Sequence, residues 1–433
     1  MLRRKIMNDL LYWKDNHINT CLLVYGASGV GKTYIIREFA KCNYDKIYEF
    51  DFLDNSSFKK IFSVDLSAGG IINKMSLIIS DFEIVKGKTL LFLDNIQECP
   101  EAITALKFLA QDNSFDVIAS GNMLGTAYCK ASSFPVGYLD RIHMYSLDFE
   151  EFLWAMGISD YSINHVKNLL KNNENISLSI HESMLDLFKK YIVVGGMPEV
   201  VLEFISSNNY DSVLKVQRKL LDSYKSDILK YAPKNLRNKI NLCFDSISLQ
   251  LSKKNKKFKY SLFDKRGIKD KYYNSLMWLY DAGLINFCYN LSIPEAPLEG
   301  NKIRDCFKVY INDTGLLVAM LDDGSNDEIM AGNLGIYKGA IYENVIAEVF
   351  TKLGKNLYYF EKNSTLEIDF FIRYNNVVTA VEVKSADNTK SKSLNSVINN
   401  YGVKADIKLS SKNLGTNKEN IISLPIYMSA FFD

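Results

Sequence analysis

The sequence lacks three features that would place it in a specialised class of protein. Its seven cysteines form no CxxC pair and its four histidines have no metal-ligand spacing, which favours buried thiols in a reducing compartment over a zinc site. No window of about eighteen uncharged apolar residues occurs, so we expect no membrane partner. A net charge of only +2 excludes no partner, because a nearly neutral chain can carry a basic module beside acidic ones. We expect a soluble, cytoplasmic protein.

The length and composition indicate several folded units. At 433 residues the chain exceeds what one hydrophobic core usually supports, and 47% hydrophobic residues are ample for about two to four cores. The patterns described below predict a multidomain α/β protein. We divide the chain into residues 1–150, 151–235, 236–330 and 331–433.

A glycine-rich loop dominates the first part. GASGVGKT at residues 26–33 follows the apolar run 21–25 and precedes a helix-prone segment. The glycines allow backbone N–H groups to surround phosphate oxygens, Lys32 adds a charge for the outer phosphates, and Thr33 offers a hydroxyl to Mg²⁺. The pattern predicts a site for ATP and Mg²⁺. The predicted loop residues are Gly26, Ala27, Ser28, Gly29, Val30, Gly31, Lys32 and Thr33.

Polar residues end the later strands of the same domain. Residues 47–52, 89–97 and 115–122 are strand-like, and the second run contains Asp94 near its end. An aspartate at the carboxyl tip of a parallel strand lies near the phosphate loop, where it can hold Mg²⁺ opposite Thr33. Ser120 and Asn122 end the third run and can sense the γ-phosphate. The alternative for Asp94 is a solvated strand end.

The residue after Asp94 bears on ATP hydrolysis. ATPases of this class commonly have a glutamate there that activates the attacking water, whereas this chain has Asn95. An amide cannot accept a proton, although Glu98 could substitute from the next turn. We therefore expect slow or conditional hydrolysis and an ATP-gated switch rather than a fast motor.

The middle of the chain is predicted to contain a helical lid and a winged helix. Helical patterns at residues 149–156 and 185–191 indicate the lid, with Gly195 and Gly196 ending one helix and Pro198 starting the next. From residue 239, a helix, a turn near Gly267, a second helix and a strand-like segment fit a winged helix.

A basic stretch at residues 253–271 lies within this module. This stretch contains nine basic residues and two acidic ones, so its local charge is 9 − 2 = +7. Lysines interleaved with aromatic residues are typical of a nucleic-acid surface, and we favour DNA as the partner. A solvated loop or a lid is the alternative. The basic residues are Lys253, Lys254, Lys256, Lys257, Lys259, Lys265, Arg266, Lys269 and Lys271.

The last part carries a second group of ionisable residues. Glu343 lies off the apolar stripe of a predicted helix at 337–354, and strands are predicted at 356–362, 366–374 and 377–386. Asp369 and Glu382 can hold Mg²⁺, Glu343 can join them through water, and Lys384 can position the attacking water for phosphodiester cleavage. The alternative is a solvated ion pair between Glu382 and Lys384.

Together these segments resemble, end to end, prokaryotic AAA-type ATP-binding proteins with a C-terminal domain of unknown function similar to PD-(D/E)xK nucleases. The resemblance rests on GASGVGKT, LLFLDNIQ, VVGGMPEVV, KGAIYENVIAEVF, EIDFFI and VEVKSA. It implies a P-loop AAA-type sheet and a restriction-endonuclease-like α/β domain with Glu343, Asp369, Glu382 and Lys384 as catalytic residues.

Two functions compete at this stage. One is an ATP-controlled, Mg²⁺-dependent nuclease, and the other is an ATP-dependent switch that binds nucleic acid or protein through a catalytically inactive nuclease-like domain. ATPases of this class often complete their site from a neighbouring subunit, so a homo-oligomer is allowed, although no motif specifies a ring.

Overall fold

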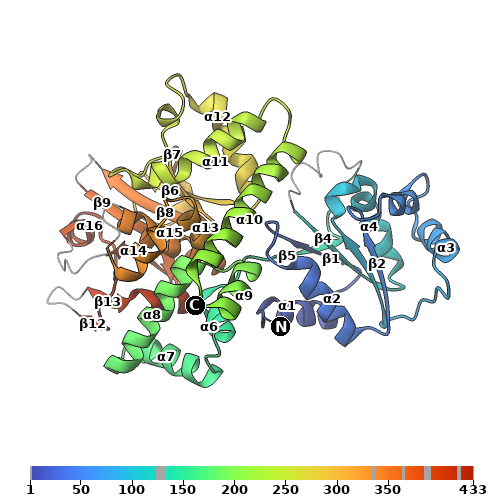
Figure 1. Ribbon diagram of the computed structural model, residues 1–433, viewed down its shortest axis with the longest axis horizontal. Helices are drawn as coiled ribbons and strands as arrows, with labels where there is room; N and C mark the ends of the chain where they lie inside the picture. The colour runs from blue at the N-terminus through green and yellow to red at the C-terminus, as the bar shows by residue number, and fades with distance from the viewer. Residues whose placement is uncertain are drawn as a thin grey trace.

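We describe the protein from a computed structural model, which defines residues 2–122, 133, 135–333, 337–362, 366–384, 392–416 and 421–432. Two lobes are visible, one built around a five-stranded sheet and a larger one around an eight-stranded sheet (Figure 1). The long helix α10 (Tyr210–Tyr231) lies between them.

The N-terminal sheet is parallel throughout, with the strand order β2-β3-β4-β1-β5. Apolar runs form its three central strands, since a parallel strand is covered on both faces. This confirms the predicted P-loop type of α/β sheet. The edge strand β5, with the sequence LDRIH, has no strand pattern of its own. The strands are β1 (Cys21–Tyr25), β2 (Lys46–Asp51), β3 (Thr89–Asp94), β4 (Asp116–Gly121) and β5 (Leu139–His143).

Helices cover both faces of this sheet. Leu22 and Val24 of β1 pack in the same apolar cluster as α1 and α2, whereas Leu23 packs in the cluster that contains α3 and α4. This alternation follows from the two-residue period of a strand. The elements are α1 (Ile6–Asn16), α2 (Lys32–Asn43), α3 (Ala68–Ile78) and α4 (Pro100–Asp112), with short 3₁₀ helices η1 (Ser56–Phe62) and η2 (Ile96–Glu98).

Five helices follow in the region of the predicted lid. Asp148 caps the first by accepting from the Glu151 backbone N–H. Gly195 and Gly196 separate α8 from α9, and Pro198 begins α9, as the sequence predicts. The first four helices are α6 (Phe149–Ala155), α7 (Asp160–Asn172), α8 (Leu178–Val194) and α9 (Pro198–Ser207), and α10 is the fifth.

The predicted winged-helix region begins with two helices and an antiparallel hairpin. α11 (Arg237–Ser252) and α12 (Lys269–Asp281) precede β6 (Ile285–Leu291) and β7 (Lys302–Ile311), which pair with each other. β6 also pairs in parallel with a strand of the C-terminal region. The larger sheet therefore runs across the boundary that we placed after residue 330.

The eight-stranded sheet has the order β12-β13-β11-β10-β9-β8-β6-β7. β10 ends at Val383, earlier than the predicted residue 386. Helix α15 packs on one face and α16 on the other. The added elements are α13 (Thr314–Ala319), α14 (Ser325–Ala331), α15 (Tyr337–Lys352), α16 (Lys392–Tyr401), β8 (Leu357–Lys362), β9 (Leu366–Tyr374), β10 (Val377–Val383), β11 (Ala405–Ser410), β12 (Gly415–Thr416), β13 (Ile422–Pro425), η3 (Tyr260–Leu262), η4 (Leu298–Asn301) and η5 (Ile426–Phe431).

Helix α15 corrects one expectation. We placed Glu343 off the apolar stripe of this helix, but every residue from 340 to 350 is buried, and Glu343 is only 5% exposed. The helix is buried all round because the sheet, α13 and η5 all contact it. Glu343 therefore needs partners inside the protein.

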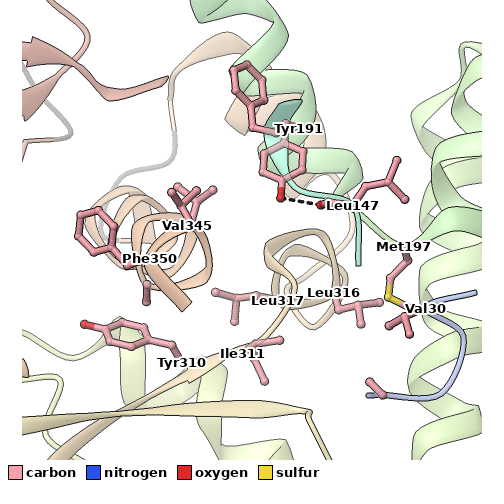
Figure 2. Packing of buried hydrophobic residues seen from close by; sticks show 14 of the residues in the cluster. Val30, Leu147, Tyr191, Met197, Tyr310, Ile311, Leu316, Leu317, Val345 and Phe350 are labelled. Atoms are coloured by element: carbon pink, nitrogen blue, oxygen red, sulfur yellow. Dashed lines mark hydrogen bonds between the residues drawn. The ribbon is translucent and has the colours of Figure 1, made fainter. Parts of the chain in front are cut away.

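One apolar cluster joins the two lobes. It extends from α1 to Phe432. Leu316 and Leu317 of α13 lie between α15, which contributes Val345 and Phe350, and Val30 of the P-loop (Figure 2). The two lobes thus share a core.

The cysteines and helices test two further expectations. Cys21, Cys99, Cys243 and Cys288 are buried, as predicted, but Cys42 is exposed on α2. Cys129 lies outside the described residues. Within the part of the chain that the structure describes, no helix combines the length and apolarity that crossing a membrane requires.

Candidate nucleotide site and C-terminal carboxylate site

The loop between β1 and α2 has the backbone geometry of a phosphate cradle. A Cβ atom on Gly26 would lie 2.1 Å from the Met144 carbonyl oxygen, so only glycine fits there. Gly31 adopts a φ of 96° immediately before α2, in the left-handed region that favours glycine. The loop thus leads directly into the N-terminus of α2, where helix N–H groups and the dipole favour an anion.

Lys32 lies within this loop. Its ammonium donates to the carbonyl oxygens of Gly26 and Ala27 at 3.1 and 2.9 Å. Burial lowers the pKa of Lys32 to about 8, although the charges of Asp94 and Asp227 oppose this shift. A buried ammonium that donates to carbonyl oxygens is favourably placed for an anionic ligand.

Asp94 and Thr33 contact each other directly. The Thr33 hydroxyl donates to Asp94 Oδ2 at 2.7 Å, and the Ser120 hydroxyl donates to Oδ1. Burial raises the pKa of Asp94, while the hydrogen bonds from Ser120 and Thr33 oppose the increase. An adjacent hydroxyl and carboxylate are the ligand types that hold Mg²⁺ beside a P-loop, so these residues fit the predicted ion.

Asn122 lies at the same edge of the sheet. Its backbone N–H donates to Gln97 Oε1 at 3.3 Å. Its side-chain Oδ1 is buried and has no hydrogen-bond partner among the described residues. Buried polar atoms normally have partners, so an unpaired acceptor here is consistent with a ligand or water at this edge. The Ser120 hydroxyl, a predicted γ-phosphate contact, donates to Asp94 in this structure.

Asn95 and Glu98 follow Asp94 but are directed to other partners. Asn95 has a φ of 55°, and its side-chain amide donates to Asp51 at 3.0 Å. Glu98 Oε1 accepts from Tyr231 at 2.7 Å and from Lys230 at 2.9 Å. Burial alone would raise the pKa of Glu98, but these hydrogen bonds outweigh it and lower the pKa. A carboxylate held in this way is a poor substitute for a water-activating glutamate.

The phosphate cradle, the buried lysine and the Thr33–Asp94 pair occur together at the carboxyl edge of a parallel sheet. Residues 19–153 match the model of an AAA domain. This part of the chain is therefore an ATPase-like AAA domain with a P-loop, which implies nucleotide binding.

The other comparisons give no function for the remaining residues. Residues 185–327 and 338–427 match two domains of unknown function, DUF8612 and DUF4143. No curated protein matches the chain significantly.

Three solved structures are similar at low identity. The Walker-type ATPase PABY2304 of Pyrococcus abyssi is 12% identical, with 74% of this chain and 96% of that chain covered and a TM-score of 0.44. The ORC1 protein of Aeropyrum pernix in complex with DNA is 11% identical, with 76% and 90% covered and a TM-score of 0.29. PCH-2 of C. elegans is 14% identical, with 48% and 60% covered and a TM-score of 0.25. At these TM-scores the similarities carry no functional argument.

Two segments outside the AAA domain contact its P-loop. The Tyr224 hydroxyl on α10 donates to the Ser28 carbonyl oxygen at 3.0 Å. A Cβ atom on Gly283, between α12 and β6, would lie 3.2 Å from the Ala27 backbone nitrogen. The sequence analysis missed both contacts, because residues this far apart in the chain share no local pattern.

Glu343 of α15 and Asp369 of β9 lie on the same side of the C-terminal sheet. Tyr358 pairs with Phe371 while Phe360 pairs with Ile368, so β9 has one extra residue in the interval that contains Asp369. Such a bulge redirects a side chain. Burial raises the pKa of Asp369 to about 7, and the charge of Glu343 adds to this shift.

Lysines neutralise this pair of carboxylates. Glu343 accepts from Lys256 at 2.5 Å and from Tyr310 at 3.2 Å, and Lys308 lies 3.6 Å away. Burial alone would raise the pKa of Glu343, but Lys308 and Lys256 outweigh it and lower the pKa. Glu343 is therefore a charged group with internal partners.

Glu382 and Lys384 lie on the opposite face of the sheet. Val381 of β10 packs in the cluster that contains α15, so the adjacent Glu382 points to the face covered by α16. Glu382 pairs in register with Lys408 of β11 and forms a short ion pair with Lys384. Its second oxygen is buried and has no hydrogen-bond partner among the described residues.

The predicted C-terminal metal site is therefore not assembled in this arrangement. Asp369 and Glu382 occupy different faces, and one oxygen of Asp369 accepts from the Val383 backbone N–H at 2.8 Å. Across the described ranges, no group of three or more acidic, histidine or cysteine side chains could hold a metal ion. The donor set does not fit Mg²⁺ here.

The basic stretch divides into two groups. Four lysines form ion pairs within the protein, namely Lys256 with Glu343, Lys257 with Glu361, Lys269 with Asp305 and Lys271 with Asp264. The other five basic residues are exposed; they are Lys253, Lys254, Lys259, Lys265 and Arg266. About half of the predicted positive charge is thus neutralised internally.

Proposed function

We propose that the protein is an ATP-controlled switch in which nucleotide binding changes how α10 contacts the AAA domain. The hydrogen bond between Tyr224 and the Ser28 carbonyl oxygen carries this proposal, because it links α10 to the loop that would surround the phosphates. Asp227 of α10 adds a charge that acts on Lys32. A change in the charge at the P-loop would therefore alter the interactions that Tyr224 and Asp227 of α10 make with it.

Different residues of the AAA domain would bind different parts of MgATP. Lys32 would neutralise the outer phosphates, and Thr33 and Asp94 would hold Mg²⁺. Bound MgATP supplies the phosphate charge and the divalent cation that make this site strongly polar. Asn122, with its unpaired side-chain oxygen, would orient water or ligand at the sheet edge.

Slow or conditional hydrolysis is part of the proposal. Asn95 cannot act as a base, and Glu98 is held by Tyr231 and Lys230 of α10. A site that binds ATP without a ready base is suited to a switch whose bound state persists.

Calorimetry and hydrogen exchange test the switch. We expect Lys32→Ala to abolish ATP binding, and we expect ATP to change exchange in α10 of the wild type. Lys41→Ala is the matched control, since Lys41 lies on the same helix and pairs with Glu38 at the surface. Equal ATP binding by Lys32→Ala, or turnover at the rate of a motor, would contradict the proposal.

We also propose that nucleic acid, with DNA favoured, binds the exposed half of the basic stretch. Lysine and arginine side chains without internal partners release counterions when they contact phosphates. Fluorescence anisotropy of the variant with Lys253, Lys254, Lys265 and Arg266 all changed to Glu tests this surface. Affinity should fall at least about tenfold and depend less on salt. Binding that is unchanged by the four substitutions would remove the surface from consideration.

The nuclease remains a second candidate. The proximity of Glu343 and Asp369 favours it, but the position of Glu382 on the other face favours a domain that binds without cleaving. DNA and RNA should be incubated with Mg²⁺ or Mn²⁺, with and without ATP. Strand scission that Lys384→Ala abolishes would support the nuclease. ATP-dependent binding that survives Asp369→Ala and Lys384→Ala would support the binding switch, and gel filtration with ATP would test a homo-oligomer.

A further inference from the structure

Helix α10, which lies between the two lobes (Figure 1), is attached to the candidate nucleotide site at two points. In its second half, the Tyr224 hydroxyl donates to the Ser28 carbonyl oxygen at 3.0 Å. At its C-terminal end, Tyr231 and Lys230 donate to Glu98 Oε1 at 2.7 and 2.9 Å. Ser28 belongs to the P-loop and Glu98 to the segment after β3. One helix thus connects the two segments that supply the predicted MgATP ligands.

The approach of α10 to the P-loop is close. A Cβ atom on Gly29 would lie 3.4 Å from Leu220 Cδ2, and Leu220 precedes Tyr224 by one helical turn. Both side chains are buried. The position of this part of α10 relative to the P-loop is therefore set by packing as well as by the hydrogen bond to Ser28.

Asp227 lies on the attached face of α10, between the two points of attachment. Each helical residue turns the chain by about 100° and advances it by about 1.5 Å. Residues 224, 227 and 231 therefore lie within about 60° of one another, along about 10 Å of the helix axis. Asp227 is half-buried, and the neighbouring Ile228 is fully buried. The Asp227 carboxylate is thus on the side of α10 that faces the nucleotide site.

The charges of Asp227 and Lys32 act on each other. Burial lowers the pKa of Lys32, and the charges of Asp94 and Asp227 oppose this shift. Burial raises the pKa of Asp227, and the charges of Lys230 and Lys32 oppose that one. Together with the placement of Asp227 on α10, these shifts indicate that its carboxylate is a counter-ion of the P-loop lysine when no nucleotide is bound.

A nucleotide would bring negative charge to the same ammonium. A P-loop lysine neutralises the outer phosphates, so Asp227 and the phosphates would share Lys32 as a partner. Like charges that are partly buried repel each other much more strongly than they do in water. The repulsion should be greater for ATP than for ADP, because the γ-phosphate adds charge on the side of the outer phosphates. The carboxylate that stabilises Lys32 in the free protein would thus oppose the triphosphate.

We infer that Asp227 distinguishes ATP from ADP by repelling the γ-phosphate, and that this repulsion displaces α10 from the P-loop. The inference rests on the proposed ATP-controlled switch and names the group through which the switch senses the nucleotide. Two other roles predict different results. A carboxylate that binds Mg²⁺ would strengthen ATP binding, and one that only pairs with Lys230 on the helix surface would not affect it.

Nucleotide affinity separates these three roles. Titration calorimetry with Mg²⁺ should compare a non-hydrolysable ATP analogue and ADP on the wild type and on Asp227→Asn, which keeps the side-chain shape but removes its charge. We expect the variant to bind the ATP analogue at least about fivefold more tightly than the wild type, with a smaller gain for ADP. Weaker binding of the analogue would assign Asp227 to Mg²⁺. Unchanged binding, or an equal gain for both nucleotides, would also overturn the inference.

Hydrogen exchange tests the displacement of α10. In the wild type, the ATP analogue should speed amide exchange at residues 224–231 more than ADP does, because the attached part of the helix is pushed away from the P-loop. In Asp227→Asn the two nucleotides should have the same effect on these residues. Equal effects of the two nucleotides on the wild type would exclude the displacement.

Three further variants make the result specific. Asp227→Glu keeps the charge and should discriminate between the nucleotides as the wild type does. Asp222→Asn is the matched control, since Asp222 is an exposed aspartate of the same helix, and it should bind both nucleotides normally. Lys32→Ala tests the switch itself. Loss of binding in Lys32→Ala with unchanged affinities in Asp227→Asn would overturn the sensing role alone, whereas a wild type that binds no ATP would overturn both the switch and the sensing role.

Discussion

The buried ion pair between Glu348 and Lys352 leads to the most direct prediction of stability. Lys352 is 4% exposed in its side chain and Glu348 is fully buried. The Lys352 ammonium donates to Glu348 at 2.6 Å, and to Ser146 Oγ and the Leu147 carbonyl oxygen at 2.8 Å each. Because Ser146 and Leu147 follow β5, this pair connects α15 to the end of the AAA sheet.

Lys352→Met should destabilise the protein strongly. The substitution leaves Glu348 as a buried carboxylate without its charge partner, although Thr314 and Tyr191 still bond to it. Removing one member of a buried pair typically costs about 3–5 kcal/mol. Glu348→Gln together with Lys352→Met should recover about 1–3 kcal/mol of this loss, because no unpaired charge remains.

Urea unfolding followed by circular dichroism measures these free energies. Lys190→Met is the matched control, since Lys190 pairs with Asp186 at the same i,i+4 spacing but at the surface of α8. This control should lose less than about 0.5 kcal/mol. A loss below about 1 kcal/mol for Lys352→Met, or a double variant less stable than Lys352→Met alone, would refute the assigned role of the pair.

Three further predictions follow from individual side chains. Because burial lowers the pKa of Lys32 to about 8, ATP binding at pH 8.5 should take up a proton. Calorimetry in buffers of different ionisation heat detects this uptake, which Lys32→Arg should lack. Burial and the charge of Glu348 raise the pKa of Asp313 to about 6, so the folded wild type holds a proton that the unfolded chain has lost above about pH 4. Stability relative to Asp313→Asn should therefore fall as pH rises from about 4 to 6, and a flat difference in urea unfolding would exclude the shift. Asn95→Glu should lower the free energy of unfolding by about 1–2 kcal/mol, because the left-handed φ disfavours glutamate and the new carboxylate would face Asp51. We expect no rapid ATP turnover in this variant. Faster turnover in a phosphate-release assay would count against this view.

The arrangement of the candidate nucleotide site was predictable because its residues form local patterns. The loop glycines, Lys32 and Thr33 are adjacent in sequence, and Asp94 ends a strand whose apolar run is unmistakable. Parallel strands bring such ends to one edge of the sheet, where Thr33 and Asp94 indeed meet.

The C-terminal site could be predicted only in part. Alternation along β10 correctly places Glu382 and Lys384 on one face, where they form an ion pair. The face that Asp369 takes depends on the bulge in β9, which no residue pattern marks. Lys256 and Glu343 are separated by 87 positions, so their contact follows from how distant elements pack.

The shared apolar cluster also has a consequence for folding during synthesis. Phe149 at the start of α6 contacts Phe431, with ring centroids 6.4 Å apart. At about 5–20 residues per second, these two rings leave the ribosome roughly 15–60 s apart. Throughout that interval the part of the Phe149 surface that Phe431 covers stays exposed, so a chaperone that shields nascent chains would have an apolar target there for most of the synthesis.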